Sequence, residues 1–417
     1  MQVENEILIN DFVRAISEAV DLISPVLNNH HKKVAYIANN IALDMGLPGD
    51  EVQSIILAAM LHDIGVFSLE EWMKIAAFDT GHHEMDRHAY IGCELLRSFE
   101  PLAHVAKIIK EHHAVYSETG KDTPISGNII HLADRLSLLY NSSREVLEQA
   151  PEMVSRVLQK QGVFHPDILA SLKRLGEKEY LWIEAFTQEI TPDKMRGAQL
   201  SREIIDVGTL REFAKTVAQI IDFRSRFTAT HSSGVAAVAM ELSSRSGFSD
   251  RECKMMEIAG FLHDLGKVAV PNEILEKEGA LDESEFNLIR KHTYYTYIIL
   301  NKIRGLEHIA VWASHHHERP DGNGYPFHVK DGDFSKLSRI MAVADIVTAL
   351  TEDRPYRLGM DKKKVESILR DMASNNTVDK DIVELANANL VYINDLRIDA
   401  QQAARKEYEA FYAAALV

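Results

Sequence analysis

Two clusters of histidine and carboxylate residues in the second half of the chain have the residue types of a metal site. His263 and Asp264 follow an apolar run and precede Lys267, and His316 and His317 stand before a glycine-rich segment further along. Burial of a histidine-aspartate pair costs free energy unless the pair is hydrogen-bonded or bound to a metal. Imidazole and carboxylate together suit a first-row transition metal. One such pair alone would be explained as well by ordinary surface histidines, so the metal interpretation needs further ligands.

Further candidate ligands occur before and after these clusters. His231 opens a predicted helix, His292 lies within another, and Asp345 lies in the apolar run 340–347. A carboxylate buried in such a helix favours a nearby cation. The predicted metal ligands are His231, His263, Asp264, His292, His316, His317 and Asp345. This set is larger than a tetrahedral zinc site needs, and it fits two six-coordinate ions that share a carboxylate or a hydroxide.

The segments that carry these residues have the pattern of helices. Apolar residues recur at helical spacing in segments such as 4–28, 31–46, 51–64 and 166–190. Alternating strand patterns are lacking, and 46% of the residues are apolar, which is enough for a packed core. The sequence therefore predicts an all-α fold.

The first half of the chain repeats the pattern of the second. Leu61-His62-Asp63-Ile64-Gly65 mirrors Leu262-His263-Asp264-Leu265-Gly266, and the offset between matched residues rises slowly from 200 to 211 along the chain. Such self-similarity indicates the duplication of one helical domain. The residues of the first half that match the predicted ligands are His31, His62, Asp63, His88, His112, His113 and Asp134.

Further motif elements follow His263 and Asp264 in a fixed order. They are Val270-Pro271, Ile274-Leu275-x-Lys277, His316-His317-Glu318, Gly324-Tyr325-Pro326 and Arg354-Pro355-Tyr356-Arg357. With these elements, the segment 205–390 resembles the HD-GYP subgroup of the HD phosphohydrolase superfamily. The resemblance implies a chain of two tandem HD-type domains. The first, 1–200, would be divergent, and the second, 201–417, would be catalytic and end in an amphipathic helix.

The resemblance also implies an activity. The implied protein is a metal-dependent phosphodiesterase of bacterial second-messenger signalling. Such an enzyme hydrolyses a 3′,3′-cyclic dinucleotide to a linear dinucleotide and can continue to mononucleotides. Cyclic di-GMP is the first expectation for the substrate, and cyclic GMP-AMP is the alternative. Asp264 would bridge two metal ions that activate a hydroxide, and Lys267 would act beside a substrate phosphate. The other expected substrate-binding residues are Tyr325, Arg354 and Arg357.

The expected cofactors are two divalent transition-metal ions in each catalytic site. A histidine-rich shell favours iron, manganese or zinc over magnesium or calcium, which prefer oxygen ligands. Iron or manganese is the first expectation, and zinc or nickel is the alternative. Some members of the family bind a third ion through a glutamate, but Phe227 stands at that position here.

The first half lacks three features of the second. Val66 stands in place of Lys267, Ala114 stands in place of Glu318, and the Gly-Tyr-Pro segment is missing. Phosphoryl transfer needs positioned cations and a shaped pocket in addition to metal ligands. We therefore expect the first half to hold metal without hydrolysing a cyclic dinucleotide, and to act as a structural or regulatory partner.

Composition limits the expected partners. The net charge of −16 argues against a general binder of nucleic-acid polymers, which would present a basic face. No apolar run reaches the ~18 residues of a membrane span. The two cysteines, Cys93 and Cys253, imply no disulfide framework and fit a reducing cytoplasm. The expected partner is the cyclic dinucleotide, and a homodimer or a signalling-protein partner stays open.

Three other functions remain open on the sequence. The chain could be an HD hydrolase of another phosphoester, a non-catalytic metal or redox sensor whose two sites control partner binding, or a di-iron oxygenase. Lys267, Arg354 and Arg357 favour phosphate chemistry over oxygen chemistry.

Overall fold

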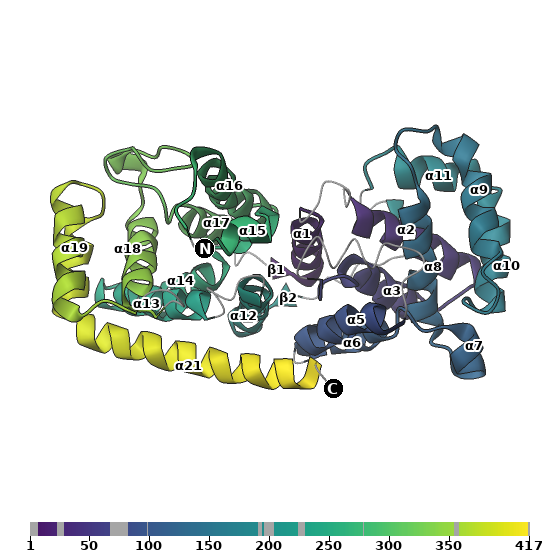
Figure 1. The fold of residues 1–417 in the computed structure, drawn as a ribbon, viewed down its shortest axis with the longest axis horizontal. Helices are drawn as coiled ribbons and strands as arrows, with labels where there is room; N and C mark the ends of the chain where they lie inside the picture. The colour runs from purple at the N-terminus through teal and green to yellow at the C-terminus, as the bar shows by residue number, and fades with distance from the viewer. Residues whose placement is uncertain are drawn as a thin grey trace. The chain divides into compact units, whose positions relative to one another are not determined.

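A computed structural model describes residues 7–22, 29–66, 82–97, 99–190, 194–195, 204–223, 230–277, 279–353 and 358–415, with the backbone alone at 82–86, 220, 223 and 410–415. Nearly all of these residues lie in helices or in the turns between them (Figure 1), which confirms the predicted all-α class. The β-structure among the described residues is one two-residue ladder, in which β1 (Ile7–Leu8) pairs antiparallel with β2 (Ile204–Ile205).

The chain divides into two compact units. One contains residues 12–203, and the other contains residues 204–417 together with residues 1–11. The β1–β2 ladder explains why the first residues belong with the second unit. Residues 196–203, where the sequence predicted the boundary between two domains, lie outside the described residues.

The helices of the first unit carry its predicted ligands at their ends or on their inner faces. They are α1 (Ile9–Asp21), α2 (His30–Asp44), α3 (Gly49–Leu61), α5 (His82–Arg97), η2 (Glu100–Leu102), α6 (Ala103–Lys110), α7 (Tyr116–Thr119), η3 (Gly120–Asp122), α8 (Ile125–Leu139), α9 (Val146–Leu158), α10 (Pro166–Gly176) and α11 (Glu179–Phe186). Within this bundle α2 packs against both α3 and α8, and α5 packs against α6.

The second unit repeats this arrangement and adds a long helix at its end. Its helices are α12 (Val207–Phe223), α13 (His231–Arg245), α14 (Asp250–Leu262), η5 (Leu265–Ala269), α15 (Asn272–Leu275), α16 (Glu283–Leu300), α17 (Glu307–Ser314), η6 (Asp331–Asp333), α18 (Lys336–Thr351), α19 (Lys362–Ser374), α20 (Lys380–Ala388) and α21 (Leu390–Ala415). Here α13 packs against α14 and α18, and α16 packs against α17. The long helix α21 runs along α13 (Figure 1).

Local sequence explains where the site-bearing helices begin. Ser249 caps α14 through a reciprocal capping box with Glu252, and Asp282 caps α16 in the same way with Glu285. These side chains satisfy backbone N–H groups that the first helical turn leaves without partners. Such starts fix the register of α14 and α16, and therefore the positions of the histidines that they carry.

One glycine in each unit brings the turn after the histidine-aspartate pair against a neighbouring helix. A Cβ atom at Gly266 would lie 1.9 Å from the carbonyl oxygen of His292, and one at Gly65 would lie 2.2 Å from that of His88. Both distances are far below van der Waals contact, so only glycine fits there. The close approach places each histidine-aspartate pair beside the next histidine of its own unit.

Two segments differ from the sequence prediction or add to it. The helix predicted over 166–190 is two helices, because the chain turns after Gly176 and Trp182 Nε1 donates a hydrogen bond back to the Gly176 carbonyl at 3.0 Å. At the end of the chain, Glu407 on α21 accepts a charged hydrogen bond from Lys215 on α12 at 2.6 Å. Among the described residues, no helix combines the length and the apolar character needed to cross a membrane.

Candidate metal centres in both domains

Three histidines of the second unit are oriented by the same local contact. The Nδ1 atoms of His263, His292 and His316 each donate to the carbonyl oxygen three residues earlier, at 2.8, 2.6 and 2.6 Å. A ring nitrogen that donates to a carbonyl carries the proton, so the other nitrogen, Nε2, keeps its lone pair. This contact is typical of metal-binding histidines, whose second nitrogen is usually held by a carbonyl or a carboxylate.

The Nε2 atoms converge on the two oxygens of Asp264. His292 Nε2 lies 3.4 Å from Oδ1, and His263 Nε2 lies 3.2 Å from Oδ2. His316 Nε2 lies 3.2 Å from His292 Nε2, and the donor atoms of His292, His316 and His317 lie within 4.8 Å of one another. The donor atoms of His231, His263 and Asp264 form a second such group. Asp264 therefore stands between two groups of donors, as a carboxylate that bridges two ions would.

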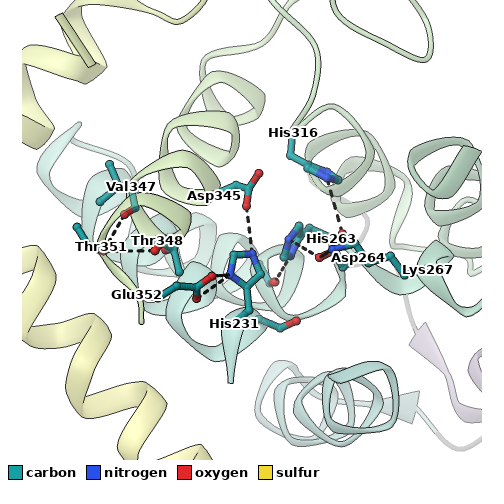
Figure 2. Close-up of polar contacts among 12 residues, drawn as sticks. His231, His263, Asp264, Lys267, His316, Asp345, Val347, Thr348, Thr351 and Glu352 are labelled. Carbon is teal, nitrogen blue, oxygen red and sulfur yellow. Dashed lines mark hydrogen bonds and ion pairs between the residues drawn. The ribbon is translucent and has the colours of Figure 1, made fainter. Parts of the chain in front are cut away.

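His231 lies between two carboxylates (Figure 2). Its Nε2 lies 3.1 Å from Asp345 Oδ1, and its Nδ1 lies 3.0 Å from Glu352 Oε2. Burial would lower the pKa of His231, but Glu352 and Asp345 raise it to about 10. Glu352 is buried and also accepts a hydrogen bond from Gln401 of α21 at 3.1 Å. The sequence analysis missed Glu352, which holds the far nitrogen of a predicted ligand.

Electrostatics keep His292, His316 and Asp264 in the charge state that a metal needs. Burial lowers the pKa of His292 to about 3 and holds that of His316 well below its usual value, so both rings are neutral near pH 7. Burial alone would raise the pKa of Asp264, yet His263 and Lys267 hold it well below its ordinary range. Neutral imidazoles and ionised carboxylates are the forms that bind divalent transition metals. The donor set therefore fits a pair of such ions.

Lys267 reaches the same carboxylate from the short helix η5. Its Nζ lies 2.6 Å from Asp264 Oδ2, as Figure 2 shows. Burial would lower the pKa of Lys267, but Asp264 raises it, so the side chain is a cation. A fixed cation beside the metal donors suits the binding of a substrate phosphate.

The Gly-Tyr-Pro loop is held to the site by Glu318. This buried carboxylate accepts hydrogen bonds from the backbone N–H groups of Phe327 at 2.6 Å and Val329 at 3.0 Å. The ring of Tyr325 lies 4.9 Å from the ring of His317, and the guanidinium of Arg290 lies 5.0 Å from the Tyr325 ring. Tyr325 thus lies beside a predicted metal ligand, and Arg290 is a neighbour that sequence reasoning missed. The other predicted substrate contacts, Arg354 and Arg357, lie outside the described residues, as does Phe227.

The first unit builds the same two groups of donors. His62 Nδ1 and His112 Nδ1 donate to the carbonyl oxygens of Ala59 and Ile109 at 2.8 and 2.6 Å, as their counterparts do. His88 Nε2 lies 3.4 Å from Asp63 Oδ1 and 3.1 Å from His113 Nε2. His62 Nε2 lies 3.4 Å from Asp63 Oδ2. All seven residues predicted for this unit are buried; six of them lie in these two groups, and Asp134 lies in a further group with His30 and His62.

His30 is an additional donor that the sequence analysis passed over. It is the first residue of α2, as His231 is the first residue of α13, and both helices have 15 residues. His30 Nε2 lies 3.3 Å from Asp134 Oδ1, which matches the contact between His231 and Asp345. The predicted residue His31 is the next residue of α2, and its Nε2 lies 3.9 Å from Asp63 Oδ2 instead. The signal was the repeat itself, because His30 keeps the spacing of the histidine-aspartate pair.

The surroundings of the two sites differ. In the first unit, Arg135 is buried and binds Asp134 Oδ2 through Nη2 at 2.8 Å and Nε at 3.1 Å. This cation was not predicted. In the second unit, His317 and Asp345 are partly exposed, whereas their counterparts His113 and Asp134 are buried. The second site therefore reaches solvent on a side where the first does not.

Comparison with known proteins gives both units a family. Residues 215–382 match the HD domain family, and residues 28–139 match an HD domain as well. The chain belongs to the HD family. The HD-type character predicted for both halves is thereby confirmed, and the two units are tandem HD domains.

The most similar relatives include HD proteins of known activity. A 3′3′-cGAMP-specific phosphodiesterase 1 of Vibrio cholerae serotype O1 is 29% identical over 391 residues, which cover 90% of each chain. A second such enzyme of that organism, phosphodiesterase 3, is 30% identical over 66% of this chain and 60% of its own. A cyclic di-GMP phosphodiesterase of Pseudomonas aeruginosa is 40% identical over 134 residues, 32% of each chain.

A solved structure supports the fold of the whole chain. The crystal structure of a cyclic GMP-AMP specific phosphodiesterase of V. cholerae superposes with a TM-score of 0.64 at 20% identity. The match covers 96% of this chain and 98% of the other, so the helical fold is shared along nearly the whole of both chains.

Proposed function

We propose that this protein is a metal-dependent phosphodiesterase that hydrolyses a 3′,3′-cyclic dinucleotide in its second HD domain. The observation that carries the proposal is the position of Asp264, between two groups of histidines and 2.6 Å from the ammonium of Lys267. This arrangement combines the donors for two metal ions with a cation for a phosphate.

Cyclic GMP-AMP is the substrate that we propose first. The relative that matches nearly the whole chain is specific for 3′3′-cGAMP, whereas the cyclic di-GMP phosphodiesterase of P. aeruginosa matches about one domain. Cyclic di-GMP is the alternative. The expected product is the linear dinucleotide, with further cleavage to mononucleotides as a second step.

The proposed roles of the side chains follow from their contacts. Metal ions bound by the seven predicted ligands would supply an activated water and stabilise charge on the transferred phosphoryl group. Asp264 orients both groups of donors, and Lys267 neutralises charge on a phosphate oxygen. Tyr325 offers an aromatic face beside His317 for a base of the substrate, and Glu318 keeps the Tyr325 loop in place through Phe327 and Val329.

Iron or manganese is the metal pair that we propose, with zinc or nickel as alternatives. The support is the donor chemistry, since each group contains imidazole nitrogens and at least one of the two groups contains a carboxylate oxygen.

We further propose that the first HD domain binds metal without hydrolysing the substrate. Val66 leaves Asp63 without a lysine partner of the kind that Asp264 has, and Arg135 is held by Asp134.

A turnover assay tests the proposed function. The full chain, loaded with Mn²⁺ or with Fe²⁺ under anaerobic conditions, is incubated with cyclic GMP-AMP, cyclic di-GMP and cyclic di-AMP, and products are identified by mass spectrometry. We expect a linear dinucleotide, formed fastest from cyclic GMP-AMP. Hydrolysis of a simple phosphodiester alone would favour an HD hydrolase of another phosphoester. A metal-loaded protein that hydrolyses none of these compounds would favour the non-catalytic sensor.

A further inference from the structure

The first HD domain contains a histidine-carboxylate pair that the second domain lacks. His31 is fully buried, and its Nδ1 lies 2.5 Å from Asp21 Oδ1, at the end of α1. Because Asp21 occupies Nδ1, Nε2 is the ring nitrogen that remains for another contact. Among the described residues, the Nε2 atoms of His31 and His62 are buried and have no hydrogen-bond partner. A buried polar atom without a partner is costly unless something else binds it.

The Nε2 atom of His31 is directed at the metal donors. It lies 3.9 Å from Asp63 Oδ2, and His62 Nε2 lies 3.4 Å from the same oxygen. The three donor atoms lie within 4.8 Å of one another. Ligands about 2.0–2.2 Å from one ion stand at such separations.

The second HD domain has a different pair at the matching place. Asp222 lies in the last turn of α12 as Asp21 lies in the last turn of α1, and it accepts a hydrogen bond from Ser232 at 3.1 Å. Ser232 follows His231 as His31 follows His30. In the second domain, Asp264 Oδ2 instead accepts a hydrogen bond from the ammonium of Lys267. The two domains thus use the same side of the matched carboxylate in two ways, with histidine in the first and lysine in the second.

We propose that His31, oriented by Asp21, is a fifth protein ligand that leaves the ion of the first site fewer open positions than the matching ion of the second. One ion there would have five protein donors, namely His30, His31, His62, Asp63 and Asp134. The matching ion of the second domain would have four, from His231, His263, Asp264 and Asp345. A six-coordinate ion then keeps one position for water or substrate in the first domain and two in the second. Sites with a structural role are closed, and catalytic sites keep open positions.

This inference rests on the proposal that the first domain binds metal, and it gives a physical reason for the expectation that this domain does not hydrolyse the substrate. The burial of all the first-domain ligands agrees with it, since His317 and Asp345 of the second site are partly exposed. The contact between His31 and Asp21 is a hydrogen bond to a carboxylate, which commonly orients metal-binding histidines and makes them stronger ligands.

The test measures metal affinity. Full-length protein carrying Asp264→Ala and His316→Ala, which disable the second site, is titrated with Co²⁺ against a chelator. In that background we expect His31→Ser to weaken Co²⁺ binding at least about 100-fold and to change the visible absorption of the bound Co²⁺. We expect Asp21→Asn to weaken binding about 10-fold, within the range seen when a partner of a metal-binding histidine is lost.

Lys32→Ala is the matched control, because Lys32 is the next residue of α2 and its side chain forms an ion pair with Glu18 at 2.7 Å. It should leave the affinity and the spectrum unchanged. His31→Gln, which preserves more volume, gives a second variant if His31→Ser unfolds, and circular dichroism of the metal-free proteins reports folding. Folded His31 variants with unchanged Co²⁺ affinity and spectrum would overturn this inference alone. Failure of the parent background to bind Co²⁺ would overturn metal binding by the first domain, and this inference with it.

Discussion

The two HD domains share a framework for metal donors and differ in what surrounds it. In both, a histidine directly after α3 or α14 donates Nδ1–H to a carbonyl three residues earlier, and the following aspartate offers one oxygen to each donor group. The framework depends on helix ends and one glycine, so it survives duplication. Lys267 and Glu318 are single side chains outside the framework, and they can be lost without disturbing it. We therefore propose that metal binding and substrate handling are separable properties of this fold.

The two sites also differ in how far they are buried, and this difference favours substrate handling by the second site. Asp134 is held by Arg135 in a buried setting, whereas the side chain of Asp345 is 14% exposed and lies near His231 and the loop that Glu318 supports. A substrate with two phosphates can approach only a site that reaches solvent. The comparison supports the proposal that catalysis takes place in the second domain, and the following variants test it.

The largest effect is expected from Asp264→Ala. The change removes the one side chain that contacts both donor groups, so turnover should fall on the order of 10³-fold or more. The metal content per chain should also fall, as measured by plasma mass spectrometry. An Asp264→Ala protein with full activity would refute the two-metal site in the second domain.

Lys267→Ala should have the next largest effect. Loss of the cation 2.6 Å from Asp264 removes charge stabilisation on the phosphate, and kcat should fall about 10²-fold, as when one transition-state donor is removed. The metal content should stay near normal, because the other donors remain. Lys277→Ala, which removes an exposed ion pair with Glu285, is the control and should be as active as the wild type. An unchanged rate in Lys267→Ala would exclude Lys267 from the reaction.

Glu318→Ala should act through the Tyr325 loop. The backbone N–H groups of Phe327 and Val329 would lose their acceptor, and the loop would shift. A misplacement of about 1 Å can cost up to about 10²-fold, and we expect about a 20-fold loss of kcat/KM, mainly through KM. Glu307→Ala, which removes an acceptor for the backbone of Gly305, serves as the control. A loss confined to kcat, with KM unchanged, would argue that Glu318 acts in the chemical step.

The smallest effect is expected from Glu352→Gln. The amide can still accept the Nδ1–H of His231, but it lacks the charge that orients the ring and strengthens the ligand. Metal affinity of the second domain should fall about 10-fold in a chelator competition, with the fold unchanged. An unaltered affinity would show that Asp345 alone is enough to position His231.

Sequence reasoning could predict most of the donor set because the repeat places each ligand twice. It missed His30 because two adjacent histidines fit the repeat within one residue; the spacing to the histidine-aspartate pair selects His30, and the start of α2 agrees with that choice. It missed Glu352 because the contact with His231 joins helices α13 and α18, which are far apart in the chain.

The fold was predictable to a similar extent. Apolar spacing identified helices but not their ends, because a short break leaves the spacing of the flanking residues almost unchanged. The predicted helix 166–190 shows this, since the turn after Gly176 depends on the contact that Trp182 makes with it. The sequence could not predict the contact partners of Lys267, Asp222 and Arg135. Each contact depends on how side chains pack in the folded domain.

The central claim is that the two sites divide metal binding and catalysis, and Asp63→Ala in the full chain tests it most directly. Metal per chain and the rate of cyclic GMP-AMP hydrolysis are measured on the same preparation, beside wild type and Asp264→Ala. We expect Asp63→Ala to lose metal from the first domain and to keep turnover within about 3-fold of wild type, a change of less than about 1 kcal/mol in the barrier. A loss of turnover as deep as that of Asp264→Ala, or a metal content equal to that of wild type, would contradict the claim.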